Sequence, residues 1–442
     1  MAGATGSVAL LGLSAYSRGA KAATTSSAVL FTNARLFDGL SLNTRPGVSV
    51  PVMDGMIVDV TDGTLTPPEG TTVIDAGGRT LMPGLIDAHW HTMLAALSLA
   101  TMLTADPGDI HLAAGVQAKR TLMRGFTTVR DLGGPAFALK RAIDAGSIAG
   151  PRIYPCGAMI SQTSGHGDFR NIRELPRIEG NLSRAEVAGA AALADGRDAV
   201  LRATREQLMH GASQIKIVAG GGVSSAYDPI DVTEFLPEEI EAAVAAAEDW
   251  GTYVCAHVYT PRGVQRCLKA GVKSIEHGQL VDADTVKMMA DSGAVWSIQP
   301  FVQELANPNK PAAMIVKERV LWDGTDTAYL LAIKHGVPTG WGTDILFDAS
   351  MAESQGRNLS YMARWYTPAQ ALKQATADNA FILGMSGPRN RYPGTLGVIQ
   401  KGAHADMLLV DGDPTQNLDL VADPDTYFKV IMKAGAIYKN TL

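Results

Sequence analysis

Eight short apolar segments, separated by helix-like stretches, fill the middle of this 442-residue chain. The apolar segments are residues 85–91, 126–130, 152–156, 214–218, 252–258, 272–277, 294–299 and 337–344. The stretches between them carry amphipathic patterns such as EEIEAAVAAAEDW at 238–250. Strands that alternate with helices favour a parallel sheet, and eight such units over roughly 300 residues fit a (β/α)8 barrel. A doubly wound sheet is the alternative, but no GxGxxG motif follows an opening strand.

Both ends of the chain differ from the middle in residue composition and pattern. Residues 28–39, 47–60 and 71–84 are rich in β-branched side chains and are broken by Asp-Gly, Pro and Gly turns. The same strand-like pattern occurs again after residue 392, in LGVIQKGAHADMLLVDGDP and YFKVIMKAGAIYKN. The sequence therefore predicts an α/β protein with a TIM barrel over residues 84–391. A β-sandwich domain, built from residues 28–83 and 392–442, accompanies it.

Residues 1–27 form a leader with a short apolar run, VALLGLSAY at 8–16, and an A-x-A step at 20–22 before a Thr/Ser-rich linker. This pattern resembles a secretory signal, although the positively charged start is missing. We interpret it as an export signal that directs the protein to the periplasm or the medium. The alternative is a small-residue leader on a cytoplasmic protein.

Composition excludes several classes of partner. A net charge of −6 and a pI near 5.9 argue against a nucleic-acid ligand, which needs a basic face. The sequence has no unbroken apolar run of about 18 residues, so no membrane span is expected. The three cysteines, Cys156, Cys255 and Cys267, have no CxxC spacing. We expect neither a disulfide framework nor a cysteine metal site.

Polar side chains of metal-ligating type stand at or near the ends of the apolar segments. In LIDAHWH, His89 and His91 are two residues apart, so in a strand they project to the same side. The full set is His89, His91, Lys216, His257, His277 and Asp344. In a barrel these positions converge at one mouth, where imidazole and carboxylate can bind a metal. A buried lysine is costly there unless CO2 converts its amine to a carbamate, whose two oxygens can each bind an ion.

Two further residues are candidates for contact with substrate. His166 lies between two glycines in SGHGDF, and these would let backbone and ligand approach closely. Tyr227, in SSAYDP, is placed to donate a hydrogen bond to a carboxylate. The alternative for His166 is a structural role in a Gly-rich turn. Arg130 and Asp131 in VRDLGG are interpreted as a structural ion pair near the mouth.

These motifs together resemble the amidohydrolase superfamily, from about residue 30 to the end of the chain. The resemblance is carried by PGLIDAHWHT (83–92), GFTTVRDLGG (125–134), SGHGDF (164–169), QIKIVAGGGVSS (214–225), CAHVYT (255–260), SIEHGQ (274–279), GTD (342–344) and LGVIQKGAHADMLLVDGDP (396–414). Within the superfamily, SGHGD and the lysine of the fourth strand are similar to the metal-dependent carboxypeptidase and prolidase-like branch. That branch includes the ochratoxin-hydrolysing amidohydrolases.

The resemblance implies a binuclear centre with two divalent ions, usually zinc. Its ligands would be His89, His91 and Asp344 around one ion, His257 and His277 around the other, and carbamylated Lys216 between them. Asp344 would take a proton from the attacking water and pass it to the leaving amine. His166 would stabilise the substrate carbonyl or hold its carboxylate. Relatives are commonly homo-oligomers, up to octamers.

The expected reaction is cleavage of the amide bond of an N-acyl amino acid or dipeptide with a C-terminal apolar or aromatic L-amino acid. Apolar neighbours at the strand ends, such as Trp90, Trp296 and Phe301, favour such a side chain. Ochratoxin A, cleaved to ochratoxin alpha and L-phenylalanine, is a leading candidate. The alternatives are a cyclic-amide hydrolase resembling hydantoinase or imidazolonepropionase, and a non-catalytic scaffold. Lys216 argues against imidazolonepropionase, which lacks it, and the complete ligand set argues against a scaffold.

Overall fold

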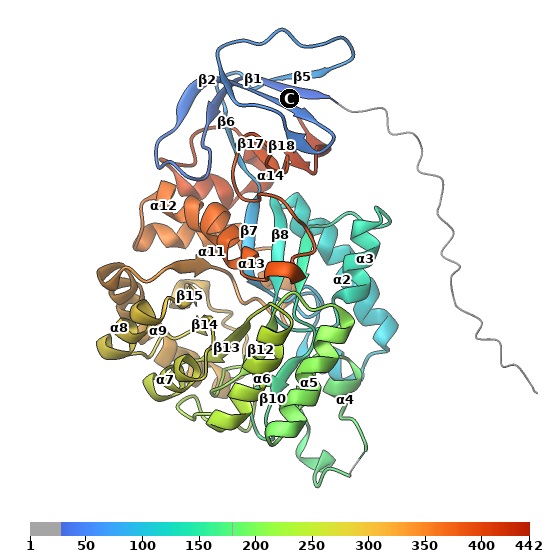
Figure 1. Cartoon of the computed structure of the whole chain (residues 1–442), viewed down its shortest axis with the longest axis vertical. Helices are drawn as coiled ribbons and strands as arrows, with labels where there is room; N and C mark the ends of the chain where they lie inside the picture. Colours follow the sequence, from blue (N-terminus) through green and yellow to red (C-terminus); the bar gives the residue numbers. More distant parts are fainter. Residues whose placement is uncertain (1–27, 179) are drawn as a thin grey trace, which may run out of the picture.

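The computed structural model describes residues 28–178 and 180–442. The expected leader lies outside the described residues. A β-sheet occupies one end of the molecule, at the top of Figure 1, and a barrel of strands surrounded by helices lies below it. Within the described ranges, no helix is long and apolar enough to cross a membrane.

All eight strands predicted for the barrel are present. They are β7 (Leu85–Trp90), β8 (Phe126–Asp131), β9 (Arg152–Pro155), β12 (Ile215–Val218), β13 (Val254–Val258), β14 (Ser274–His277), β15 (Val295–Ile298) and β16 (Thr339–Trp341). Neighbouring strands pair in parallel, in the runs β7-β8-β9 and β12-β13-β14-β15-β16. Backbone hydrogen bonds of 2.8 Å join the two runs at both seams, from Ser213 N to Pro155 O and from Asp344 N to His89 O. The TIM barrel expected from the alternation is confirmed.

Helices cover the outside of the barrel (Figure 1). The long ones are α2 (Pro107–Met123), α3 (Phe137–Asp144), α5 (Arg197–His210), α6 (Pro237–Asp249), α7 (Pro261–Lys269), α8 (Ala283–Ser292) and α9 (Ala312–His335). The shorter ones are α1 (Leu99–Thr104), α4 (Arg184–Val187), α10 (Ala349–Ala352), α11 (Gln355–Ser360), α12 (Pro368–Lys373), α13 (Asn379–Gly384) and α14 (Pro424–Tyr427).

Local chemistry explains where these helices start and stop. Helix α8 begins where the Asp282 carboxylate accepts a hydrogen bond from Thr285 N, and it ends at Gly293 in the left-handed conformation. Helix α6 begins with Pro237 at its first position and buries its alanine-rich face. Helix α6 also contacts the barrel strands β12 and β13.

The barrel carries two short strands that the sequence did not indicate. They are β10 (Met159–Ser161) and β11 (Ala191–Leu193), and β10 pairs in parallel with both β11 and β12. Three residues are too few to show a period of two, so the apolar run at Met159–Ser161 has no strand signature. The segment SGHGDF begins three residues after the end of β10, so this short strand positions His166 near the mouth of the barrel.

The terminal strands form one sheet that takes strands from both chain ends, in the region where the sequence predicted a β-sandwich. Its order is β19-β18-β17-β6-β1-β2-β3, with β4 beside β2 and β5 beside β1. These strands are β1 (Val29–Leu36), β2 (Arg45–Met53), β3 (Met56–Ile57), β4 (Thr61–Asp62), β5 (Thr72–Asp75), β6 (Thr80–Pro83), β17 (Met407–Val410), β18 (Phe428–Lys433) and β19 (Ala436–Asn440). A buried cluster that includes Phe31, Val50, Leu409 and Met432 joins residues from both ends. The domain boundaries at 83/84 and 391/392 stay a prediction.

Candidate metal centre

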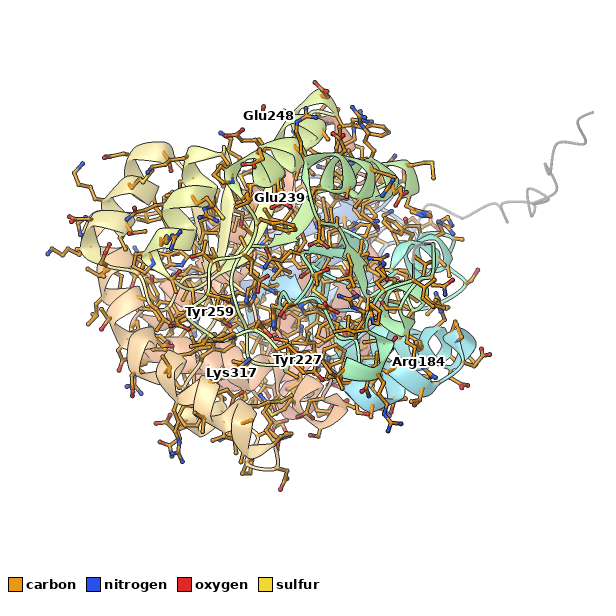
Figure 2. The ribbon with its side chains drawn as sticks, turned by 90° about the horizontal axis from the view of Figure 1, so that it is seen from below. Arg184, Tyr227, Glu239, Glu248, Tyr259 and Lys317 are labelled. Atoms are coloured by element: carbon orange, nitrogen blue, oxygen red, sulfur yellow. The ribbon has the colours of Figure 1, made fainter. Side chains whose placement is uncertain are left out.

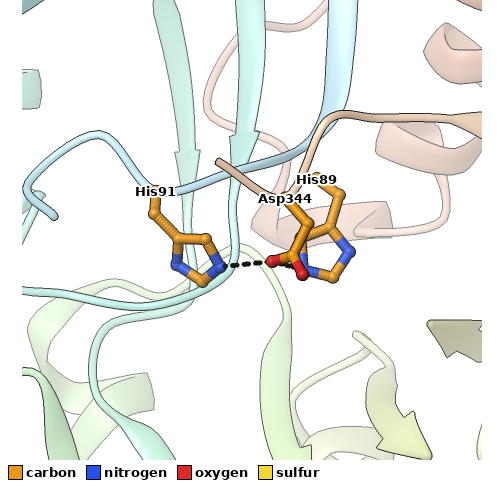
Figure 3. Close-up of side chains that lie close together, drawn as sticks. All are labelled: His89, His91 and Asp344. Carbon is orange, nitrogen blue, oxygen red and sulfur yellow. Dashed lines mark hydrogen bonds and ion pairs between the residues drawn. The ribbon is translucent and has the colours of Figure 1, made fainter. Parts of the chain in front are cut away.

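His89, His91 and Asp344 meet at the end of β7 (Figure 3). One ligand atom of each lies within 4.8 Å of the other two. The Asp344 carboxylate stands between the two imidazoles, with Oδ1 3.1 Å from Nε2 of His89 and 3.1 Å from Nε2 of His91. Two imidazole nitrogens and one carboxylate oxygen converging on one small volume form a ready site for a divalent cation.

His257 and His277 extend this group along β13 and β14. The two rings lie 4.3 Å apart between centroids, and His277 lies 4.9 Å from His89. Nδ1 of His277 is 3.9 Å from Asp344 Oδ2. Both ring nitrogens of His277 are buried without a hydrogen-bond partner among the described residues. Such an unpaired buried imidazole is expensive, so the pattern fits residues that hold a metal.

The backbone is strained at two of these positions. His277 has φ of 76° and Asp344 has φ of 55°, both in the left-handed region that residues other than glycine rarely adopt. Strain of this kind costs energy and gathers at functional sites. At both positions it turns a polar side chain at a strand end into the mouth of the barrel.

Lys216 stands in the middle of β12, paired in register with Cys255 of β13. Its side chain is only 2% exposed. No hydrogen bond or ion pair of its amine occurs within the described part of the chain. A buried, unpaired ammonium is unfavourable, which fits the carbamate hypothesis. The three cysteines are free and buried.

The hydrogen bonds of three imidazoles leave one nitrogen of each ring for a ligand. Nδ1 of His89 bonds Glu276 Oε2 at 2.9 Å, and Nε2 of His257 bonds the Gly221 carbonyl at 3.1 Å. Nδ1 of His91 lies 3.4 Å from the Gly133 carbonyl. Oxygen partners of this kind fix the tautomer of a metal-ligating histidine. The other nitrogens are Nε2 of His89 and Nε2 of His91, which both face the Asp344 carboxylate, and Nδ1 of His257.

Electrostatics favours the protonation states that metal ligands need. Burial lowers the pKa of His91 and moves the pKa of His257 and His277 well below the usual value. Burial acts to raise the pKa of Asp344, but the adjacent His89 and His277 outweigh it and leave the pKa well below its ordinary range. Neutral imidazoles and an ionised carboxylate bind a cation without first losing a proton.

Arg130 does not pair with Asp131, so that interpretation of the sequence is wrong. Successive residues of a strand point to opposite faces, which separates the two side chains. The Arg130 guanidinium instead donates to both oxygens of Glu276, at 2.8 and 2.9 Å. Asp131 accepts a hydrogen bond from Thr92 N at 2.7 Å. Arg130 and Glu276 are both fully buried. The guanidinium of Arg130 fixes the Glu276 carboxylate, and this carboxylate orients His89.

We expect Glu276→Gln to lower metal affinity by about 10- to 100-fold, because partners that orient a ligand contribute on that scale. The neutral side-chain amide of the introduced glutamine has a single acceptor oxygen. It cannot both accept the hydrogen bond from His89 and replace the ion pair with Arg130. Titration of the metal-free protein with zinc measures the change. Glu239→Gln is the matched control, because Glu239 is also buried but caps α6 away from the centre. Equal zinc affinity in Glu276→Gln and wild type would contradict this role.

His166 lies against the metal-ligand group rather than in a remote turn. Its ring stacks on His257 with 4.3 Å between centroids. Its Nδ1 is 2.6 Å from Ser225 Oγ and 3.6 Å from Asp228 Oδ2. A Cβ on Gly222 would meet the ring at 2.1 Å, so glycine is required there for the ring to fit. This position fits the expected contact with substrate, which stays a prediction.

The two tyrosines near the mouth differ in burial. Tyr227 is 47% exposed, and its carbonyl accepts a hydrogen bond from Ser164 Oγ. Tyr259, which the sequence interpretation missed, is 3% exposed. Its ring centroid lies 5.0 Å from that of His257 and 5.2 Å from that of His277. The period of two places residue 259 on the same side as residue 257, and this signal could have identified it.

The apolar neighbours named from the sequence divide into two kinds. Phe301 stacks on His277 with 5.8 Å between ring centroids and is partly exposed. Trp90 and Trp296 are fully buried in hydrophobic clusters. Only Phe301 of the three therefore offers an accessible apolar surface beside the ligand group.

Known proteins are similar to this chain in sequence and in fold. Residues 80–439 match the amidohydrolase family. The chain is 30% identical to ochratoxinase of Aspergillus niger over 382 residues, which covers 81% of this chain and 76% of that protein. A crystal structure of an amidohydrolase superposes with a TM-score of 0.86 at 35% identity, covering 94% of this chain and 100% of the other. A prolidase complexed with N-methylphosphonate-L-proline superposes with a TM-score of 0.84 at 32% identity, with the same coverage.

The family match covers more than half of the chain, and its span includes all six residues expected to hold metal. The barrel, the terminal sheet and the prolidase-like resemblance agree with it. The enzyme class predicted from the sequence, a hydrolase acting on amide bonds, is confirmed. The chain belongs to the amidohydrolase family.

Proposed function

We propose that this enzyme is a binuclear metal hydrolase that cleaves the amide bond of an N-acyl amino acid or dipeptide and releases an L-amino acid with a free carboxylate. The observation that carries the proposal is the convergence of ligand-type side chains from strands of one barrel. Four imidazoles and one carboxylate gather there, and three of the ring nitrogens, Nε2 of His89 and both nitrogens of His277, have no hydrogen-bond partner within the described residues. The ochratoxinase and prolidase relatives support an amide substrate.

The residues present fit two divalent cations, which we propose to be zinc. His89, His91 and Asp344 would hold one, His257 and His277 the other, and a carbamate on Lys216 would bridge them. When bound, such ions polarise the scissile carbonyl and make water a nucleophile at neutral pH.

The side chains of this chain supply the remaining steps. Asp344, which is ionised, accepts the proton of the attacking water and delivers it to the leaving nitrogen. His166 and Tyr259 both pack against His257 and donate hydrogen bonds to the substrate carbonyl oxygen or carboxylate. Tyr227 donates to the carboxylate of the leaving amino acid. Such donors stabilise the charge that develops in the transition state.

The leaving amino acid has a bulky apolar or aromatic side chain. Phe301 offers the partly exposed ring that such a side chain would contact, because it stacks on His277 at the edge of the ligand group. The relative in Aspergillus niger is an ochratoxinase, so ochratoxin A is the first specific compound to try. Its cleavage would give ochratoxin alpha and L-phenylalanine.

The test is a panel of N-acyl amino acids and dipeptides that differ in the C-terminal residue and in whether its carboxylate is free. Release of the amino acid is measured by chromatography. The proposal requires the highest kcat/KM for a free acid with an apolar or aromatic side chain. Cleavage of cyclic amides in place of these substrates would contradict it.

A further inference from the structure

We propose that Lys317 of α9 is a positioning residue that holds the loop 222–228 against the mouth of the barrel and thereby holds His166 in place. We call this loop the substrate loop, because it carries Ser225 and Tyr227. The effect on catalysis rests on the proposed function, whereas the effect on the loop does not. Figure 2 looks at the molecule from below and labels Lys317 and Tyr227 in the same region as Tyr259.

The Lys317 ammonium donates to three carbonyl oxygens of the substrate loop. The distances from Nζ are 2.7 Å to Gly222 O, 3.0 Å to Ser225 O and 2.7 Å to Asp228 O. An ammonium has three donors and no acceptor, so its capacity is filled. Charge-assisted hydrogen bonds are the strong ones, and the Asp228 carboxylate adds an ion pair at 3.8 Å. One side chain of a distant helix therefore fixes both ends of this loop.

Two residues of the substrate loop hold His166 in position. Ser225 Oγ and Asp228 Oδ2 both face Nδ1 of His166, at 2.6 and 3.6 Å. Asp228 also accepts a hydrogen bond from Gly222 N at 2.6 Å, which closes the loop on itself. Displacement of the loop would remove the partners of Nδ1 and the flat surface that Gly222 offers to the ring. Lys317 thus controls where Nε2 of His166 points.

Direct binding of substrate by Lys317 is the competing role. With all three donors bonded to backbone carbonyls, no N–H of Lys317 remains for a substrate carboxylate. Its side chain is also only 19% exposed. These contacts favour a residue that acts through the loop over one that touches the substrate.

Hydrogen exchange of the full-length enzyme tests the first half of the proposal without any substrate. In Lys317→Met, the amides of residues 222–228 should exchange at least about tenfold faster, because the loop loses its charged hydrogen bonds. Lys310→Met is the matched control, because Lys310 lies close in sequence and pairs with Glu318 instead of the loop. Unchanged protection of 222–228 in Lys317→Met would overturn the proposal, whatever the enzyme hydrolyses.

Chemical rescue tests the second half. Lys317→Cys treated with 2-bromoethylamine regains an ammonium on a side chain of nearly the same length, while iodoacetamide adds a neutral group. The native cysteines are fully buried, which directs the reagent to position 317. We expect the aminoethylated enzyme alone to regain loop protection and kcat/KM on an N-acyl amino acid, with metal content equal in both forms. Equal kcat/KM in the two alkylated forms would overturn the catalytic role. Failure of the wild type to cleave N-acyl amino acids would instead contradict the proposed function.

Discussion

Lys216→Ala is expected to lose both bound metal and amide hydrolysis. The lysine is 2% exposed in β12 and has no partner for its amine among the described residues, which fits an amine that CO2 converts to a bridging carbamate. Without that bridge, the remaining ligands would hold two cations poorly. Metal chemistry supplies several kcal/mol of transition-state stabilisation, so kcat/KM should fall by at least about 10³-fold. Metal analysis and initial rates measure the two losses.

Two controls make this result specific to the carbamate. Small carboxylates or bicarbonate should partly restore metal and activity to Lys216→Ala, because they supply the missing bridging oxygens. Lys216→Arg should stay inactive, because a guanidinium remains cationic and cannot form a carbamate. Wild-type turnover in the arginine variant would show that Lys216 plays no part in the centre.

Masking the substrate carboxylate as an amide should cut kcat/KM by orders of magnitude. A site built to hydrogen-bond a carboxylate leaves buried polar groups unpaired when the carboxylate is absent. The expected loss is about 2–5 kcal/mol of transition-state binding, or roughly 30- to 4,000-fold. N-aroyl-phenylalanine and its C-terminal amide form the matched pair of substrates.

The same pair should be compared in His166→Ala, which removes a polar group proposed to bind the substrate. If His166 binds the substrate carboxylate, the variant should lose most of the preference for the free acid. If it stabilises the substrate carbonyl instead, hydrolysis of both substrates should slow by a similar factor. Equal rates on the free acid and the amide in the wild type would mean that the carboxylate is not recognised. A cyclic amide or an ester would then be the better hypothesis.

The fold and the candidate ligands could be predicted because their signals are local. A buried parallel strand is a short apolar run, and a period of two fixes the side on which His89 and His91 lie. The barrel then brings strand ends together, so Lys216, His257 and Asp344 could be grouped without knowing any distance. Packing in the structure agrees for Asp344, which contacts His89 and His91 at the end of β7.

Features that depend on partners distant in sequence could not be predicted. Arg130 meets Glu276, which is 146 positions away, and the sequence suggested its neighbour Asp131 instead. Lys317 meets a loop about 90 residues earlier, and nothing in the helix around it marks that contact. The strand β10 is too short to show a period. In each case three-dimensional packing decides the outcome, and local propensity carries no information about it.

Metal analysis of the purified, active enzyme tests the central claim most directly. The ligand set predicts close to two divalent ions per chain, loss of activity on chelation, and recovery when zinc is returned. A preparation that is fully active with no bound metal would contradict it.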